Sequence, residues 1–247
     1  MMRIDVMTLF PEMCERVLDE SIIGRARRNG IVSVECHNIR DYVTEKHRHV
    51  DDMPYGGGQG MLMKPEPIEA CFNAIVSQSG SRPFLIYLSP KGRVFNQGIA
   101  REFLSKEHIC LLCGHYEGID QRVIDSMVDM ELSVGDYVLT GGELPALIVT
   151  DAVCRMVPGV LAEDACFEEE SHYAGLLEHS QYTRPPVWNG MSVPEELLSG
   201  HHARIAGWKR LNALEQTARY RPDLLQEAEL SPSEKRYLME KQLIGET

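Results

Sequence analysis

Residues 133–145 read SVGDYVLTGGELP, and they connect an apolar segment, Val128–Leu132, to a run that is typical of a helix. Gly135, Gly141 and Gly142 allow the main chain to bend sharply and to approach a ligand closely. A helix N-terminus also offers backbone N–H groups that have no partner within the helix. The stretch therefore predicts a ligand-binding loop between a strand and a helix.

Two further loops follow apolar runs in the same way. The loop Gly114–Asp120 (GHYEGID) follows Ile109–Cys113, and the turn Tyr87–Gly92 (YLSPKG) ends another strand-like run. Because ligands bind at the carboxyl edge of parallel sheets, the three loops predict one pocket there. None of them contains G-x-G-x-x-G or G-x-x-x-x-G-K-[ST], so neither a standard dinucleotide fold nor a P-loop is indicated.

Alternating strand-like and helix-like runs predict a mainly parallel α/β sheet. The strand-like runs are Arg3–Leu9, Ile31–His37, Pro83–Ser89, His108–Cys113 and Val128–Val134. The helix-like runs are Glu12–Asp19, Pro65–Ser77, Asn96–Ser105, Gln121–Ser126 and Glu143–Val157, the last of which is stopped by Pro158 and Gly159.

The pattern changes after residue 160. Residues 161–170 hold five Asp or Glu with no clear period. From residue 176 onward there is no strand pattern, but a helical run extends from about His201 to Tyr220. A last helix begins at Ser231, where Glu234 completes a capping box. We therefore expect an α/β domain over 1–160, an interdomain linker over 161–175, and a small all-helical domain over 176–247.

The composition is that of an ordinary globular protein, with 43% hydrophobic and 25% charged residues in 247. No apolar run approaches the roughly 20 residues that span a bilayer, so no membrane association is expected. Seven scattered cysteines, an odd number, favour reduced thiols and a cytoplasmic location. Cys110 and Cys113 have C-x-x-C spacing, but no second pair completes a tetrahedral metal site, so we expect them in the core.

The net charge of −12 looks unfavourable for a protein that binds nucleic acid. Residues 176–247, however, hold 9 Lys or Arg and 10 Asp or Glu, so residues 1–175 carry −11 of the total. An acidic body of this kind can still bind RNA through local basic surface, but it should bind non-specific nucleic acid poorly.

Four segments closely resemble the bacterial tRNA (guanine-N(1)-)-methyltransferases of the TrmD type. They read PYGGGQGMLMKPEP (54–67), GHYEGID (114–120), SVGDYVLTGGELPAL (133–147) and GLLEHSQYTRPPVWNGMSVPEELLSGHHARIAGWKR (175–210). The resemblance covers nearly the whole chain. It implies a SPOUT methyltransferase, with a mainly parallel α/β sheet, a deep trefoil knot and a helical C-terminal domain. The family uses S-adenosylmethionine, acts on the tRNA guanosine immediately 3′ of the anticodon and works as a homodimer.

The resemblance implies that the three loops bind the methyl donor in a bent shape. The residues it assigns to the donor site are Tyr87, Leu88, Ser89, Gly114, Tyr116, Glu117, Gly118, Ser133, Val134, Gly135, Asp136, Tyr137, Val138, Leu139, Gly141 and Gly142. Adenine suits apolar walls with main-chain hydrogen bonds, and glycines give it access to the backbone. A side chain at Gly141 or Gly142 is expected to fill the space that the adenosine approaches.

The reaction requires few polar groups. A sulfonium methyl is already activated, but N(1) of guanine must lose a proton while negative charge gathers on the base oxygen. The site therefore needs a carboxylate base and a cation or N–H donors. The resemblance implies that Arg155 is the active-site arginine. Glu170 stands where the family has an aspartate and is the expected base, with Glu169 as the alternative. The acidic run could instead be a solvated turn, and Arg155 could form a surface salt bridge.

Several segments are candidates for contact with tRNA. The glycine-rich loop 52–61 is either a flexible connection or a segment that closes near the target base, as the family implies. The family usually has Ala or Pro where this chain has Gln59. Candidate basic contacts are Lys46–His49, Arg25–Arg28, His201, His202, Arg204, Lys209 and Arg210, although such runs are usually solvated faces.

The expected activity is methylation of guanine N(1), and three alternatives remain. One is ribose 2′-O-methylation with a similar donor site. Another is a non-catalytic RNA-binding protein that has kept the donor pocket. The third, a nucleotide-binding regulator, is disfavoured because the chain lacks a P-loop lysine. The family reaction is associated with magnesium, but the sequence contains no carboxylate cage that predicts a protein-bound metal ion.

Overall fold

The protein folds into two compact units, Met1–Asp164 and Ala165–Thr247. The computed structural model describes residues 1–45, 47–161, 170–173 and 175–245. Most of the expected linker, including Glu169, lies outside the described residues. No helix in the described segments is both long and apolar enough to cross a membrane.

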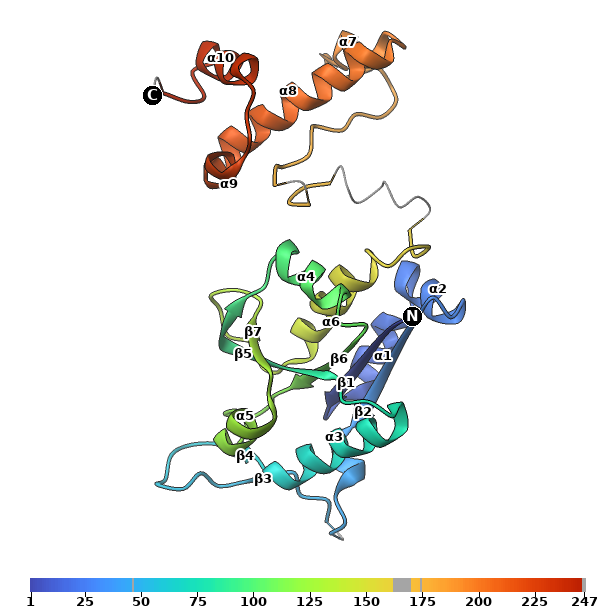
Figure 1. Cartoon of the computed structure of the whole chain (residues 1–247), viewed down its shortest axis with the longest axis vertical. Coiled ribbons are helices and arrows are strands. Elements are labelled where there is room, and N and C mark those ends of the chain that lie inside the picture. Colours follow the sequence, from blue (N-terminus) through green and yellow to red (C-terminus); the bar gives the residue numbers. More distant parts are fainter. Residues whose placement is uncertain (46, 162–169, 174, 246–247) are drawn as a thin grey trace. The chain divides into compact units, whose positions relative to one another are not determined.

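The first unit is built on a five-stranded parallel sheet, so the predicted α/β architecture is confirmed (Figure 1). The strands lie in the order β2-β1-β6-β5-β7. Their bounds are Met2–Thr8 (β1), Val32–Asn38 (β2), Phe84–Val94 (β5), His108–Cys113 (β6) and Met130–Ser133 (β7). The central strand β6 is apolar and buried from Ile109 to Cys113, because helices cover both faces of a parallel sheet.

Helix α6, Glu143–Cys154, packs on β1 and β6 and contacts α1 and α4. The other helices of this unit are α1 (Pro11–Leu18), α2 (Ser21–Arg28), α3 (Pro65–Ser79), α4 (Gln97–Leu104), α5 (Gln121–Met127) and the 3-10 helix η1 (Ile39–Tyr42). Helix α3 packs on β1, η1 and α5, and it closes a core around Met7, Ile68 and Leu112. A short antiparallel pair, β3 (Asp51–Asp52) and β4 (Leu62–Met63), brackets the glycine-rich loop.

Two expectations for the first unit need correction, and one helix was missed. Strand β5 does not end at Ser89 but continues to Val94, and its register with β7 shifts between Leu88 and Arg93, which both pair with Leu132. Helix α6 ends at Cys154, with Arg155 as its C-cap, rather than at Val157. Helix α2 was not expected, and Gly24 within it weakens the local helical signal.

The second unit contains helices α7 (Glu195–Leu198), α8 (His202–Tyr220), α9 (Pro222–Glu227) and α10 (Pro232–Glu240). The expectation of no strands here was wrong, because β8 (Val187–Trp188) and β9 (Met191–Ser192) form a hairpin. Its turn is Asn189-Gly190, and both residues have positive φ, as this two-residue turn requires. The capping box of Ser231 and Glu234 is present at the start of α10.

Candidate functional site

One cavity of about 210 Å3 is lined by three segments, which are the part of β5 where its register shifts and the loops that leave the carboxyl ends of β6 and β7. We call them the first (Tyr87–Gly92), second (Gly114–Asp120) and third (Ser133–Gly142) cavity loops. Every residue that the sequence assigned to the donor lines this cavity, except Asp136. The sequence reasoning missed Pro90, His115, Leu132, Thr140 and Pro145, which also line it. All five lie within or next to the recognised motifs, so their position beside the assigned residues could have predicted them.

The second and third cavity loops touch backbone to backbone. The Gly142 N–H donates to the Gly114 carbonyl oxygen at 3.0 Å. A Cβ atom on Gly142 would lie only 2.6 Å from the Cα atom of Cys113, which is buried in β6. A glycine is therefore required at this position for the start of α6 to meet the second loop.

Aromatic and apolar side chains form much of the cavity wall. Burial raises the pKa of the Tyr87 phenol, which therefore stays protonated at neutral pH. In the third loop, Tyr137 donates from its hydroxyl to the Val134 carbonyl at 3.2 Å, and Ser133 Oγ donates to the Gly135 carbonyl at 3.0 Å. Local bonds thus shape this loop, whose Val138 remains 83% exposed. An apolar wall with accessible backbone suits a nucleoside.

The glycine-rich loop ends at the rim of the same cavity. The Glu117 N–H donates to the Met61 carbonyl at 3.0 Å, and the Met63 N–H donates to the Gly118 carbonyl at 2.9 Å. Residues 61–63 therefore run beside the second cavity loop. Tyr55, within the glycine-rich loop, is 99% exposed, so its side chain has room to contact a bound molecule.

The two expected catalytic residues belong to different units. Arg155 is half-buried at the C-cap of α6 in the first unit. Glu170 is half-buried in the second unit, where its carbonyl accepts a hydrogen bond from the Tyr173 N–H at 3.4 Å. Neither described unit by itself contains both side chains, so their joint role stays a prediction.

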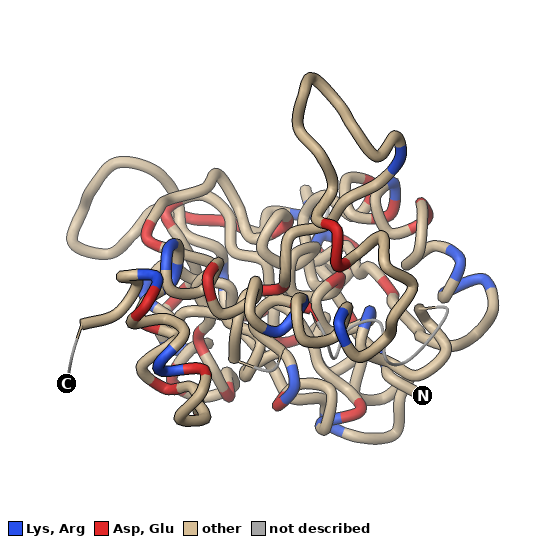
Figure 2. The backbone as a smooth tube through the Cα atoms, turned by 90° about the horizontal axis from the view of Figure 1, so that it is seen from above, with Lys and Arg blue, Asp and Glu red and all other residues tan. Residues whose placement is uncertain are grey.

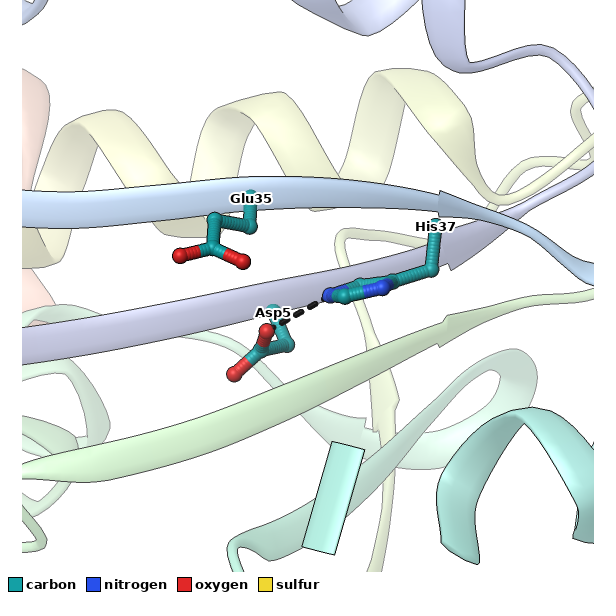
Figure 3. Close-up of side chains that lie close together, drawn as sticks. All are labelled: Asp5, Glu35 and His37. Carbon is teal, nitrogen blue, oxygen red and sulfur yellow. Dashed lines mark hydrogen bonds and ion pairs between the residues drawn. The ribbon is translucent and has the colours of Figure 1, made fainter. Parts of the chain in front are cut away.

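Another cluster of polar side chains surrounds the fully buried Asp5 in the middle of β1 (Figure 3). Its carboxylate accepts two hydrogen bonds from Arg3, at 2.9 and 3.0 Å. The Nε2 atoms of His37 and His108 lie 2.7 and 2.6 Å from its two oxygens. Asp5, Glu35 and His37 have the side-chain types of a metal site, but Arg3 Nη2 also lies 3.7 Å from Glu35. The guanidinium thus already supplies a cation to both carboxylates.

The Asp5 cluster predicts a loss of stability in acid. Burial alone would raise the pKa of Asp5, but hydrogen bonds from His37, Arg3 and His108 outweigh it and lower the pKa from 3.8 to about 2. The unfolded chain therefore takes up the proton first as the pH falls. The contribution of Asp5 to the free energy of unfolding amounts to about 2 kcal/mol. It is complete above about pH 4 and is lost as the pH falls towards 2.

Urea unfolding at pH 6 and pH 2 tests this prediction. The wild-type free energy of unfolding should fall by about 2 kcal/mol more than that of Asp5→Asn. Asp223→Asn removes an exposed carboxylate paired with Arg221 and should behave like the wild type. Equal losses in the wild type and in Asp5→Asn would contradict the assignment.

Acidic and basic residues are interspersed along the described chain rather than gathered in one long run (Figure 2). Several basic residues that are candidates for contact with tRNA form salt bridges with nearby Asp or Glu side chains. Arg27 Nη1 lies 2.7 Å from Asp19, and Arg210 Nε lies 2.7 Å from Glu234. Lys46 lies outside the described residues. These pairs reduce the basic surface that is available for non-specific binding of RNA.

The fold and cavity define a class of α/β protein that binds a ligand at the carboxyl edge of a parallel sheet. Residues 2–227 match the family described as tRNA (Guanine-1)-methyltransferase TrmD. The chain belongs to this family, and the resemblance seen in its motifs is confirmed.

Similar proteins extend over nearly the whole chain. The tRNA (guanine-N(1)-)-methyltransferase of Alkaliphilus oremlandii is 53% identical over 242 residues, which cover 96% of this chain and 97% of the relative. Its counterpart in Moorella thermoacetica is 52% identical over 240 residues, covering 97% and 96%. That of Dehalococcoides mccartyi strain 195 is 49% identical over 239 residues, again covering 97% and 96%.

Proposed function

We propose that this protein transfers a methyl group from S-adenosylmethionine to N(1) of the tRNA guanosine immediately 3′ of the anticodon. One observation carries the proposal. The three cavity loops line a single cavity, in a chain about half identical to tRNA (guanine-N(1)-)-methyltransferases along almost its entire length. Mass spectrometry of nucleosides after incubation with tRNA and donor tests it. 1-Methylguanosine supports the proposal, whereas a 2′-O-methylated product or no product favours the alternatives.

The methyl donor fits the cavity chemically. Leu88, Val134 and Leu139 offer apolar wall to an adenine ring, and the glycines leave backbone groups within reach. When bound, the donor supplies a methyl group that is already activated by its sulfonium. The protein therefore has to orient the guanine, exclude water and accept one proton.

We propose Glu170 as the group that accepts the N(1) proton and Arg155 as the group that stabilises the charge developing on the guanine oxygen. A carboxylate has the basicity for the first role and a guanidinium has the charge for the second. The bond from the methyl carbon to sulfur breaks as the bond to N(1) forms, and the N(1) proton passes to Glu170.

The same proposal includes a trefoil knot in the first unit, as in the SPOUT fold. Two close backbone approaches support it. A Cβ atom on Gly92 would lie 2.3 Å from the Leu132 backbone nitrogen. The Gly142 N–H donates a hydrogen bond to the Gly114 carbonyl oxygen. At both places, segments distant in sequence thus pass one another without a side chain between them. A crystal structure traced through residues 84–154 would test the knot.

We further propose that the protein is a homodimer. Met13 and Val17 on α1, and Leu144 and Ile148 on α6, are apolar pairs four residues apart that are 44–55% exposed. A groove lined by Val17, Ile22 and Leu147 among others joins these helices. Exposed apolar surface of this kind marks protein–protein contacts. A second copy of the chain is the partner that the family implies.

Mixing two inactive variants tests the dimer at the active site. If Arg155 and Glu170 of one site come from different chains, Arg155→Ala and Glu170→Ala subunits should together regain activity. Random pairing leaves one intact site in each mixed dimer, so we expect about a quarter of wild-type activity. Light scattering should report a dimer. Full activity from a monomer, or no recovery in a mixture shown to exchange subunits, would contradict the shared site.

The remaining roles follow from the substrate. We propose that the glycine-rich loop 52–61 closes near the target guanine, since it ends at the cavity rim, and that the second unit contacts the tRNA. A cytoplasmic location follows, because the tRNA substrate is found there. Magnesium dependence also stays a prediction, which activity measured with EDTA and with added Mg2+ tests.

A further inference from the structure

A buried carboxylate lies beneath the third cavity loop. Glu143, the first residue of α6, is only 4% exposed, and its Oε1 accepts a hydrogen bond from Thr8 Oγ at 2.7 Å. Thr8 Oγ in turn accepts the Phe10 N–H at 2.9 Å. Since an N–H group can only donate, the single hydroxyl proton of Thr8 points to Glu143. The carboxylate is thereby fixed to the carboxyl end of β1.

A second polar group nearby lacks a partner. Among the described residues, His115 Nδ1 is buried without a hydrogen bond. Its ring packs against Phe10 and Tyr116, with centroids 5.0 Å from each. A buried polar atom that is left unpaired costs free energy, so its position in the wall of a ligand cavity requires a reason.

Gly141 brings the two groups together. A Cβ atom on Gly141 would lie 2.4 Å from Glu143 Oε2 and 2.9 Å from His115 Nδ1. Both atoms are therefore within 3 Å of one point, and the missing side chain of Gly141 makes room for them. Oε2 is also not the oxygen that Thr8 holds, since Thr8 donates to Oε1. An imidazole N–H and a carboxylate oxygen are complementary donor and acceptor.

We propose that Glu143 is a positioning residue for the methyl donor. When the donor fills the cavity, His115 donates from Nδ1 to Glu143 Oε2, and this bond holds Gly141 and Gly142 against the ligand. Loop closure excludes water, and the lower local dielectric strengthens the bond. The inference rests on the proposed function of the cavity, and it adds a coupling from Thr8, through Glu143, to the third cavity loop.

The first measurement needs no variant. The imidazole 15N resonances of His115 should shift to those of a hydrogen-bonded Nδ1–H when S-adenosylhomocysteine saturates the wild-type protein. A role confined to the fold would leave them unchanged on binding. Unchanged resonances in a protein that binds S-adenosylhomocysteine would overturn the inference but not the proposed function. No binding at all would overturn both.

The second measurement is calorimetry with S-adenosylhomocysteine. Glu143→Gln keeps the size of the side chain but removes the charge that strengthens the bond, so affinity should fall about 10- to 100-fold. Thr8→Val should show a smaller loss, because the carboxylate remains but is no longer fixed. Glu12→Gln, at an exposed position in the first turn of α1, is the matched control and should bind like the wild type. Wild-type affinity in a folded Glu143→Gln protein would also overturn the inference.

Discussion

Replacing Glu170 by Gln slows methyl transfer in a single turnover by about 100- to 10,000-fold, because the variant keeps the size of the side chain but loses its basicity. Donor binding hardly changes, since the carboxylate acts on guanine and not on adenosine. Rapid-quench kinetics with saturating tRNA measures the rate, and calorimetry with S-adenosylhomocysteine measures the binding. Glu170→Asp should retain activity, because it keeps a carboxylate at the position where the resemblance implies an aspartate.

Two outcomes would revise this assignment. A full single-turnover rate in Glu170→Gln combined with a slow Glu169→Gln would place the base one residue earlier. Full rates in both variants would make the acidic run a solvated turn. The proton would then leave by another route, for example through Glu117, which lines the cavity.

Replacing Gly142 by Ala weakens the binding of S-adenosylhomocysteine by about 100-fold or more, because the added Cβ would lie 2.6 Å from the Cα atom of Cys113. Cys113 is fixed in the buried strand β6, so the third cavity loop has to move instead. Calorimetry measures the loss of affinity, and circular dichroism verifies that the variant is folded.

Gly207→Ala provides the matched control for this change. Gly207 lies within α8, and nothing is within 4 Å of the position of its added Cβ. Alanine is also the better helix former, so this variant should fold and bind like the wild type. Wild-type affinity in a folded Gly142→Ala protein would remove the third loop from the donor site.

The positions of the main strands along the chain were predictable because local signals and tertiary structure agree. The run His108–Cys113 is apolar, contains no breaker and becomes β6 with the expected bounds. The bulge in β5 was not predictable, because it arises where Leu88 and Arg93 both pair with Leu132 of a distant strand. The hairpin at residues 187–192 has strands too short for an alternating pattern, although Asn189-Gly190 was an available signal.

In the candidate site, too, local sequence signals predicted some features but not those that depend on distant contacts. The cavity-lining loops follow from glycine spacing, but the interactions beneath them depend on contacts distant in sequence. Asp5 meets His37 and His108 only through the register of β1 with its two neighbours. At Gly141 the expected reason for a glycine stays a prediction, and the structure adds a second one, because an added Cβ atom would meet Glu143 and His115.

The most direct test of the proposed reaction uses two tRNA transcripts without modifications, differing at one nucleotide. One carries guanosine immediately 3′ of the anticodon and the other carries adenosine there. After incubation with the protein and S-adenosylmethionine, mass spectrometry of nuclease fragments locates any added methyl group. We predict 1-methylguanosine at that nucleotide in the first transcript and no methylation of the second. A methyl group on a ribose, at another position, or on neither transcript would contradict the account.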